Sequence, residues 1–441
     1  MSRTKALSTA IASLLMLAIP AAHGAEDEKP AATKPAEPLV VIHAGTLIAV
    51  PGRAPLQHAT IVVRGKQIES VKEGYSDVPG ARVIDLKKDT VLPGLIDCHV
   101  HLTTPLLPGS RSGVRASSAD YALAGVVHAR QTLDAGFTTV RDLGADSEAI
   151  FPLRNAIQRG EIAGPRVIAA GRLIGPTGGH GDVGGGYPDA IRVLLVGGST
   201  CDGAADCRRA VRRQVMQGAD VIKIATTGGG GDAGGNEDAA PEMQFDEVEA
   251  IVQTAHALGR KVAAHAHGTA GILLALRAGV DSIEHGGFID SEGIAQLKKR
   301  DATLVPTMSV IDKIAKEIDK ADAKDKPRMQ GFLDKMPKNV GAAYRSGARI
   351  AFGTDASITE HGANAHEFEW YLRIGMTPTA ALQSATVNAA QLLGLEKEIG
   401  TIEPGKSADI VASEADPLTD VAALKKIVFV MKSGTVHRNP P

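Results

Sequence analysis

The order of hydrophobic and polar positions divides the chain into segments of two kinds. From Leu39 to about Leu92, short runs rich in β-branched residues are separated by Gly and Pro turns, which predicts a small antiparallel sheet. From Val91 onward, short apolar runs alternate with longer stretches of helical character. The segments 400–412 and 426–437 return to strand character.

Strand and helix alternate eight times in the central part of the chain. The eight apolar runs are VLPGLID, FTTVRDL, PRVIAAG, DVIKIA, KVAAHAH, DSIEH, ATLVPT and RIAFGTD. This alternation predicts an α/β fold, a (β/α)8 TIM barrel over residues 93–395 with its active site at the carboxyl ends of the strands. Residues 39–92 and 396–441 are expected to form a small β-sandwich domain from both ends of the chain.

The first residues have the three parts of a secretory signal peptide. Residues 1–25 contain two basic residues, an apolar run from Ala6 to Ala22, and a stretch of small residues. The alternative is a membrane anchor, but the run is shorter than the ~20 residues that a span needs, and no later stretch is long enough. We therefore expect a periplasmic or secreted protein without stable membrane insertion after cleavage. Residues 26–38 predict a Pro- and Ala-rich linker.

Export affects the interpretation of the three cysteines, because an oxidising compartment permits disulfides. Cys201 and Cys207 enclose a short polar loop, and a local bridge and two free thiols are both open alternatives. Cys98 lies on an apolar strand between a carboxylate and an imidazole residue, where we expect a buried, inert thiol.

Composition and charge exclude several classes of protein. Hydrophobic residues make up 44% and charged residues 22%, as in ordinary soluble globular proteins. Lys and Arg number 48 against 50 Asp and Glu, and aromatic residues are only 3%. Basic residues are not in excess, and few aromatic side chains are available to stack on bases, so a nucleic-acid partner is not expected.

Residues that can bind metal fall at the ends of the predicted strands. In the segment 97–101, a strand period of two places His99 and His101 on the same side, facing the mouth of the barrel. Lys223 lies in an otherwise apolar strand, where an unpaired ammonium is costly and should be neutralised or modified. The other candidates follow three later strands: His265, His267, Glu284, His285 and Asp355. Together these residues predict a two-metal hydrolytic site.

These motifs resemble the amidohydrolase superfamily over nearly the whole chain from residue 39. The motifs that carry the resemblance are LPGLIDCHVH at 92–101, GADVIKI at 218–224, VAAHAHG at 262–268, DSIEHG at 281–286, FGTDA at 352–356 and GTIEPGKSADIV at 400–411. Within the superfamily, the chain is similar to imidazolonepropionase-like enzymes that include exported Xaa-Pro and Xaa-Arg/Lys dipeptidases and ochratoxin-hydrolysing amidases. The resemblance implies a barrel with a β-sandwich domain.

The resemblance also implies a set of ligands for two divalent metal ions, for which Zn²⁺ is suitable. The implied ligands are His99, His101 and Asp355 for the more buried ion, and His265 and His285 for the more exposed one. Lys223 matches a lysine that reacts with CO2, and the N6-carboxylated side chain bridges both ions. A hydroxide bridging the ions would attack the amide carbonyl, and Asp355 would pass its proton to the leaving amine.

Several positions remain open. His267 follows His265 by two residues, so spacing cannot choose the ligand, and the resemblance favours His265 with His267 contacting substrate. His180 and His361 are candidates for substrate binding, and His366 is a weaker one. The run 228–231 lacks the Lys-Ser/Thr of a phosphate loop, so a substrate loop is expected there. Phe245 stands where the family often has Tyr, which leaves the side-chain preference open.

The leading functional hypothesis is an exported binuclear enzyme that cleaves the amide bond next to a C-terminal amino acid. Substrates would be dipeptides and N-acyl amino acids, including ochratoxin A. The first alternative is a deaminase or a hydrolase of cyclic amides or lactones, and Lys223 argues against its mononuclear forms. The second is a catalytically inactive binding protein, against which the intact ligand set argues. A homo-oligomer is expected.

Overall fold

The computed structural model describes residues 37–104, 116–182, 184, 187–229 and 235–439. The expected signal peptide, and nearly all of the linker that follows it, lie outside these residues. So do Gly230 and Gly231 of the glycine run. None of the helices in the described ranges combines the length and apolar character needed to cross a membrane.

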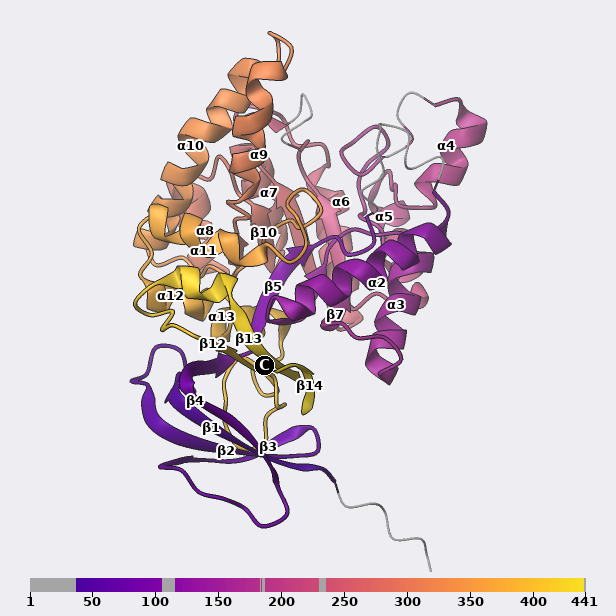
Figure 1. Cartoon of the computed structure of the whole chain (residues 1–441). Coiled ribbons are helices and arrows are strands. Elements are labelled where there is room, and N and C mark those ends of the chain that lie inside the picture. The colour runs from indigo at the N-terminus through magenta and orange to yellow at the C-terminus, as the bar shows by residue number, and fades with distance from the viewer. Residues whose placement is uncertain (1–36, 105–115, 183, 185–186, 230–234, 440–441) are drawn as a thin grey trace, which may run out of the picture. The chain divides into compact units, whose positions relative to one another are not determined.

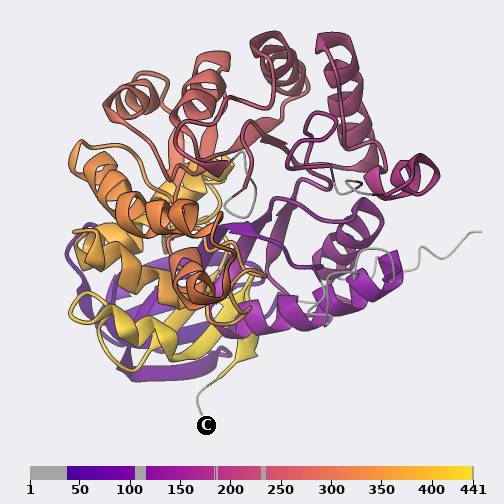
Figure 2. The ribbon, with the colours of Figure 1, turned by 90° about the horizontal axis from the view of Figure 1, so that it is seen from above.

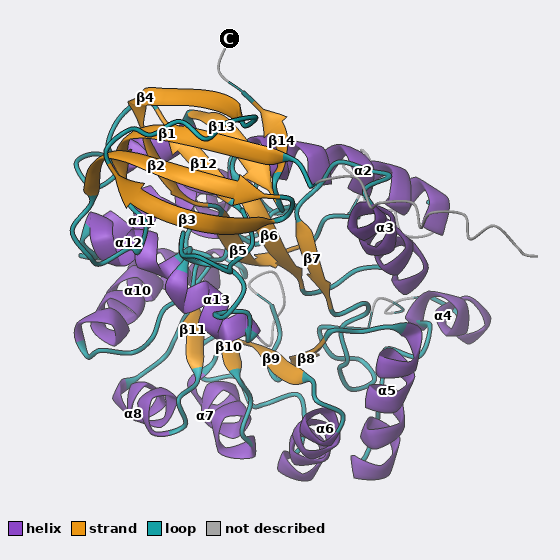
Figure 3. Cartoon of the chain, turned by 90° about the horizontal axis from the view of Figure 1, so that it is seen from below, coloured by secondary structure: helices purple, strands orange, loops and turns teal. Residues whose placement is uncertain are grey.

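The two ends of the described chain meet in a seven-stranded sheet (Figure 3). Its order is β14-β13-β12-β4-β1-β2-β3. The strands are β1 Leu39–Leu47, β2 Leu56–Arg64, β3 Gln67–Glu73, β4 Arg82–Pro93, β12 Ile410–Ser413, β13 Ile427–Lys432 and β14 Thr435–Arg438. Neighbours are antiparallel except β1 and β4, which pair in parallel and are separated in the sequence by the β2–β3 hairpin. The sheet has its own buried core.

Seven regular strands of the barrel pair in parallel in two groups, β5-β6-β7 and β8-β9-β10-β11. Their bounds are β5 Leu95–Val100, β6 Phe137–Asp142, β7 Arg166–Ala169, β8 Val221–Ala225, β9 Lys261–Ala266, β10 Ser282–His285 and β11 Thr303–Val305. The groups join at one seam where the Ile174 amide donates to the Lys223 carbonyl at 2.9 Å. Most side chains of these strands are buried, as expected for a sheet covered on both faces.

The eighth expected strand, 349–355, is extended but has no regular ladder. It closes the other seam by single hydrogen bonds: Leu304 N donates to Arg349 O at 2.9 Å, and Cys98 N donates to Phe352 O at 2.8 Å. At its end, Asp355 has a φ of 56°, in the left-handed region that a ladder cannot accommodate. The barrel therefore closes, and the irregular end turns the Asp355 backbone out of strand geometry.

Helices surround the barrel (Figures 1 and 2). They are α2 Ser118–Asp134, α3 Ser147–Arg159, α4 Asp189–Val196, α5 Ala204–Gln217, α6 Phe245–Ala257, α7 Thr269–Ala278, α8 Ser291–Lys299, α9 Val310–Glu317, α10 Lys326–Arg345, α11 Glu367–Arg373, α12 Pro378–Ser384 and α13 Val387–Leu393. The expected fold class, a TIM barrel with a separate β region, is confirmed. The expected domain boundaries stay a prediction.

Local sequence signals explain where several helices begin and end. The Ser117 side chain accepts from the Asp120 amide at the start of α2, and the Asp120 carboxylate accepts from the Ser117 amide, which completes a capping box. Helix α5 ends at Gly218, whose φ of 113° would strain any other residue. Cys201 and Cys207 form a disulfide that joins the first turn of α5 to the preceding loop. Cys98 is a buried free thiol.

Candidate active site

Six expected residues converge where the barrel strands end. All six line one cavity of about 600 Å³ together with His180 and His267. The six are His99 and His101 on β5, Lys223 on β8, His265 on β9, His285 on β10, and Asp355 after the eighth extended segment. Residues separated by more than 250 positions thus meet, because parallel strands place their carboxyl ends at one face of the barrel.

Two groups of potential metal ligands lie in this cavity. In each group the ligand atoms lie within 4.8 Å of one another, and the groups are His99, His101, Asp355 and His265, His267, His285. The rings of His99 and His285 are 4.9 Å apart between centroids, so the groups adjoin. Imidazoles with one carboxylate are a donor set suited to divalent cations. The second group contains both His265 and His267, so the geometry leaves the choice between them open.

A buried ion pair orients His99. Its Nδ1 donates to Glu284 at 2.9 Å, and Arg141 donates to the other oxygen of Glu284 at 2.8 Å. Burial opposes the charge of Glu284, but Arg141 and His99 outweigh it and lower its pKa to about 2. Burial lowers the pKa of His99 to about 4. A neutral ring that donates through Nδ1 presents the Nε2 lone pair to the cavity, as a metal ligand must.

Two other imidazoles have one nitrogen engaged away from the cavity centre. His101 donates through Nδ1 to the Gly144 carbonyl at 2.7 Å, and its Nε2 lies 3.0 Å from Asp355 Oδ1. His285 Nδ1 is hydrogen-bonded to the Thr307 hydroxyl at 2.7 Å. In both rings Nδ1 is engaged and Nε2 is the atom that remains to bind an ion; in His101 that atom is paired with Asp355, another candidate ligand. Burial disfavours charged Asp355, yet the His101 bond and nearby positive groups hold its pKa well below the usual range.

Lys223 is buried, with its ammonium 3.4 Å from His99 Nε2. Burial lowers its pKa to about 8, because desolvation penalises the charged form. Glu284 and Asp355 act in the opposite direction. An appreciable fraction of this lysine is therefore a neutral amine, and hence nucleophilic, near neutral pH.

Asp97 holds the backbone of one expected ligand, His99, and of Thr354, the residue before another, Asp355. Its buried carboxylate accepts from the amides of His99 and Thr354 at 3.1 and 3.2 Å, and from the Asn364 side chain at 2.8 Å. Asp97 belongs to the motif at 92–101, but the sequence predicted no role for it, and none for Arg141. The available signal was a charged residue inside a fully buried strand, since such a group must have a specific partner.

The structure places the four remaining histidines differently. His180 stacks on His265 at 4.4 Å between ring centroids, and His267 stacks on His285 at 4.9 Å, so both lie beside the ligand groups. His361 instead stacks on His128 at 4.3 Å and is not among the described residues lining the cavity. His366 pairs with Asp312 and Glu369, and the exposed Phe245 begins α6; neither lines the cavity.

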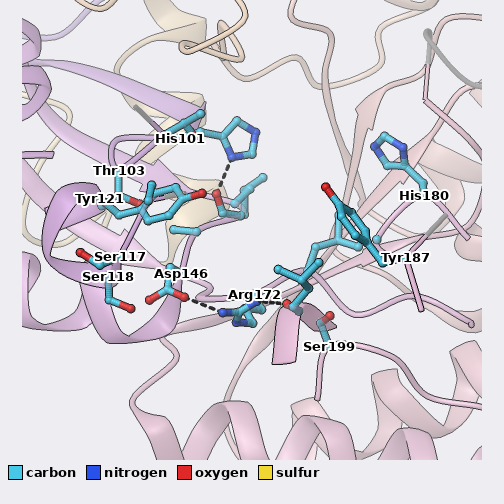
Figure 4. A pocket seen from close by; sticks show the side chains of 18 residues that line it. His101, Thr103, Ser117, Ser118, Tyr121, Asp146, Arg172, His180, Tyr187 and Ser199 are labelled. Atoms are coloured by element: carbon cyan, nitrogen blue, oxygen red, sulfur yellow. Dashed lines mark hydrogen bonds and ion pairs between the residues drawn. The ribbon is translucent and has the colours of Figure 1, made fainter. Parts of the chain in front are cut away.

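The rest of the cavity wall combines apolar and charged side chains. The apolar ones come mainly from α9 and α10: Val310, Ile314, Met329, Phe332 and Met336. Lys313 and Arg328 also line it. A second cavity of about 700 Å³ shares His101, Thr104, Leu173 and His180 with the first. Figure 4 shows Tyr121 and Tyr187 on opposite sides of this second cavity, with the Asp146–Arg172 ion pair between them. Together the two cavities can hold a molecule larger than a small dipeptide.

Comparison with known proteins agrees with this geometry. A model of the amidohydrolase family matches residues 90–437. Ochratoxinase of Aspergillus niger is 31% identical over 91% of this chain and 87% of its own length. Its crystal structure superposes with a TM-score of 0.81, covering 92% of this chain and 96% of that one, at 29% identity. A Xaa-Pro dipeptidase with methionine bound in its active site superposes with a TM-score of 0.82 at 34% identity, covering 91% and 100%.

Proposed function

The chain belongs to the amidohydrolase family, and on this premise we propose that it is an exported enzyme with two divalent metal ions. The coarser statement already follows from its relatives: it is a hydrolase of carbon–nitrogen amide bonds in a metal-dependent family. The finer proposal is that it cleaves the amide bond next to a C-terminal amino acid in dipeptides and N-acyl amino acids.

The observation that carries the proposal is the meeting of both ligand groups and Lys223 in one cavity. Imidazoles with one nitrogen already tied to the protein, and a carboxylate with a low pKa, are suited to hold cations rather than to bind each other alone. Divalent ions held there, with Zn²⁺ the favoured species, would supply an activated water near neutral pH and polarise the amide carbonyl.

Lys223 and Asp355 have distinct parts in this proposal. Neutral Lys223 Nζ attacks CO2, loses one proton, and becomes a carbamate with two oxygen donors. This replaces a costly buried cation by an anion, and the lowered pKa of the lysine favours the reaction. Asp355, whose Oδ1 lies 3.0 Å from His101 Nε2, would take a proton from the attacking water and deliver it to the departing nitrogen.

Cationic and imidazole groups of the cavity are proposed to bind a carboxylate on the substrate. Lys313 and Arg328 line it together with one acid, Glu317, and Arg328 is also paired with Asp325 at 2.9 Å, so Lys313 is the proposed cationic contact. His180 and His267 can donate hydrogen bonds beside the ligand groups. The relatives include an ochratoxinase and a Xaa-Pro dipeptidase, and the adjoining cavity provides room for a bulky acyl group. We therefore include aryl amides such as ochratoxin A among the substrates.

Export rests on the sequence of residues 1–25, and N-terminal sequencing of the secreted protein tests it. The expected start lies near Ala25 or Glu26, whereas a Met1 start would contradict export. The mature enzyme is proposed to be a homo-oligomer, which its mass in solution tests directly: a monomeric mass would contradict it.

The deciding functional experiment compares an N-acyl amino acid with its C-terminal carboxamide. The proposal expects kcat/KM to fall at least about tenfold for the carboxamide, because a charge-assisted contact is lost. Equal values would remove carboxylate recognition from the proposal. Turnover of cyclic amides or lactones alone would instead support the alternative chemistry of the same fold.

A further inference from the structure

Glu367, the first residue of α11, is a fully buried carboxyl group outside the cavity. Its two oxygens accept from the backbone amides of Met308 and Ser309, at 2.6 and 2.7 Å. Within the described ranges, no Lys, Arg or His nitrogen lies within 4.0 Å of it as an ion-pair partner. Burying a carboxyl group without a cation costs free energy, so its two bonds to one loop need an explanation.

The loop that Glu367 holds is the one that orients His285. It follows β11 and contains Thr307, whose hydroxyl lies 2.7 Å from His285 Nδ1. Thr307 has a φ of 50° and His285 a φ of 69°, a region that β-branched and bulky side chains rarely adopt. A strained loop relaxes unless its surroundings hold it. The amides that Glu367 accepts from directly follow Thr307 in the sequence.

A second, weaker connection runs to the other ligand group. The Ser309 hydroxyl donates to the Thr354 carbonyl at 3.4 Å, close to the limit of a hydrogen bond. Thr354 immediately precedes Asp355, and its own hydroxyl donates to Asp97 at 2.7 Å. Glu367 therefore lies behind the loops of both ligand groups, but only the Thr307 branch has short contacts throughout.

We propose that Glu367 is a positioning residue: it clamps the Met308–Ser309 backbone so that Thr307 holds His285 in the orientation that binds metal. The proposal concerns the metal centre of the proposed function and rests on it for its consequence. Glu367 itself touches neither the cavity nor the ligand atoms. Loss of a group that hydrogen-bonds a ligand directly, as Thr307 does here, typically weakens metal binding by about 10–100-fold, and loss of the clamp on Thr307 should approach this range.

The chain offers a matched control in Glu247, near the start of α6. It is also a buried carboxylate that accepts from two backbone amides, those of Gly203 at 2.6 Å and Gln244 at 2.8 Å. The Gly203 amide lies in the loop before α5, which contains no expected ligand. Gln244 ends the connection from β8 to α6, whose Gly228 carbonyl lies 3.2 Å from His265 Nε2. Gln244 is at the opposite end of that connection, however, whereas Met308 directly follows Thr307. Glu367→Gln and Glu247→Gln therefore remove the same kind of contact, and a purely structural effect should be similar in both.

The test is a calorimetric titration of metal-free protein with Zn²⁺. Glu367→Gln should weaken at least one binding event by about 10–100-fold, whereas Glu247→Gln should leave both events within about twofold of the wild type. If Glu367→Gln does not fold, Glu367→Met, of similar length and without oxygen acceptors, takes its place. Equal weakening in both positions, or none at position 367, would overturn the proposal.

A double-mutant cycle with Thr307→Val checks the route. If Glu367 acts through Thr307, the double variant should bind Zn²⁺ about as weakly as Thr307→Val alone. The single variant Thr307→Ser keeps the hydroxyl, so its affinity for Zn²⁺ should be close to that of the wild type. Additive losses would contradict this route. The titration measures metal binding and not turnover. A wild type that binds Zn²⁺ but hydrolyses no amide would therefore contradict the proposed function, while the role of Glu367 could still be tested.

Discussion

Side-chain charge in the cavity depends on partners that lie one layer behind it. The Arg141–Glu284 pair is almost completely buried, at 2% and 0% exposure. Arg141 also donates to the Cys98 carbonyl at 2.6 Å, so it links the strand of His99 to the residue that orients that histidine. A pair of this kind contributes little by itself compared with an apolar substitute, but breaking it leaves an unpaired buried charge.

Arg141→Met is therefore expected to destabilise the fold strongly. Removing one partner of a buried pair costs about 3–5 kcal/mol, because Glu284 would remain charged or take up a proton. Denaturant unfolding of the metal-free protein measures this loss. Arg349→Met is the control: its ion pair with Asp301 is mostly exposed on the carboxylate side, at 77%, and such pairs are worth about 0–1 kcal/mol. Similar losses in both variants would contradict the account of Glu284.

Asp355→Asn tests the proton-transfer role. The amide can still bond a neighbouring imidazole but cannot accept a proton, so kcat should fall by about 10²–10⁴-fold. Metal content, measured by elemental analysis, should remain above half of the wild-type value. Activity near that of the wild type would exclude Asp355 as the base.

At the scale of the elements, the sequence motifs predicted which residues meet in the site, because the last residues of parallel strands lie at one face of the barrel. His99, Lys223, His265, His285 and Asp355 all meet as that rule requires. The rule does not apply to His361, which was predicted to bind substrate, because a residue in a long loop has no strand periodicity that fixes the direction of its side chain. His361 packs against His128. The sequence predicted no role for Arg141, Asp97 or Glu367, and only three-dimensional contacts reveal their partners.

The loop before α5 gives a prediction about the disulfide. Both sulfur-bearing residues are fully buried, and the bridge closes a loop with a sequence separation of 6. In the chain-entropy model a loop of this size is worth about 2 kcal/mol. Reductant should therefore lower the thermal midpoint of the wild type. It should have no effect on a Cys201→Ser/Cys207→Ser double variant, and peptide mapping should recover the joined peptides without reductant; two free thiols there would reject the bridge.

At the scale of the whole molecule, the terminal sheet and the barrel share a partly buried contact through Lys432. This residue of β13 donates to the Gly164 carbonyl at 2.7 Å. Burial, reinforced by Arg166 and Lys66, lowers its pKa to about 8 from the ordinary 10.5. The unfolded chain therefore binds more protons between these two values, so this residue makes stability rise as the pH increases from about 8 to about 10.

Lys432→Met should remove that rise. Relative to wild type, the variant should gain stability near pH 7, where the buried cation is fully charged, and lose that gain toward about pH 10. The difference in thermal midpoint between the two proteins, followed across this range, is the measurement. Lys72→Met, at an exposed position of the same sheet and not among the charges that shift the pKa of Lys432, should give a nearly constant difference. Parallel pH profiles for Lys432→Met and wild type would contradict the assigned shift.

The central claim is that the cavity at the barrel mouth holds a metal pair on which hydrolysis depends. The most direct test is to strip the purified protein of metal and add back Zn²⁺ in the presence of bicarbonate, with an N-acyl amino acid as substrate. Activity should be absent at first and should rise to a plateau at about two equivalents per chain. Lys223→Ala should bind less metal and reach only a small fraction of that plateau. Full activity of the stripped wild type would contradict the claim.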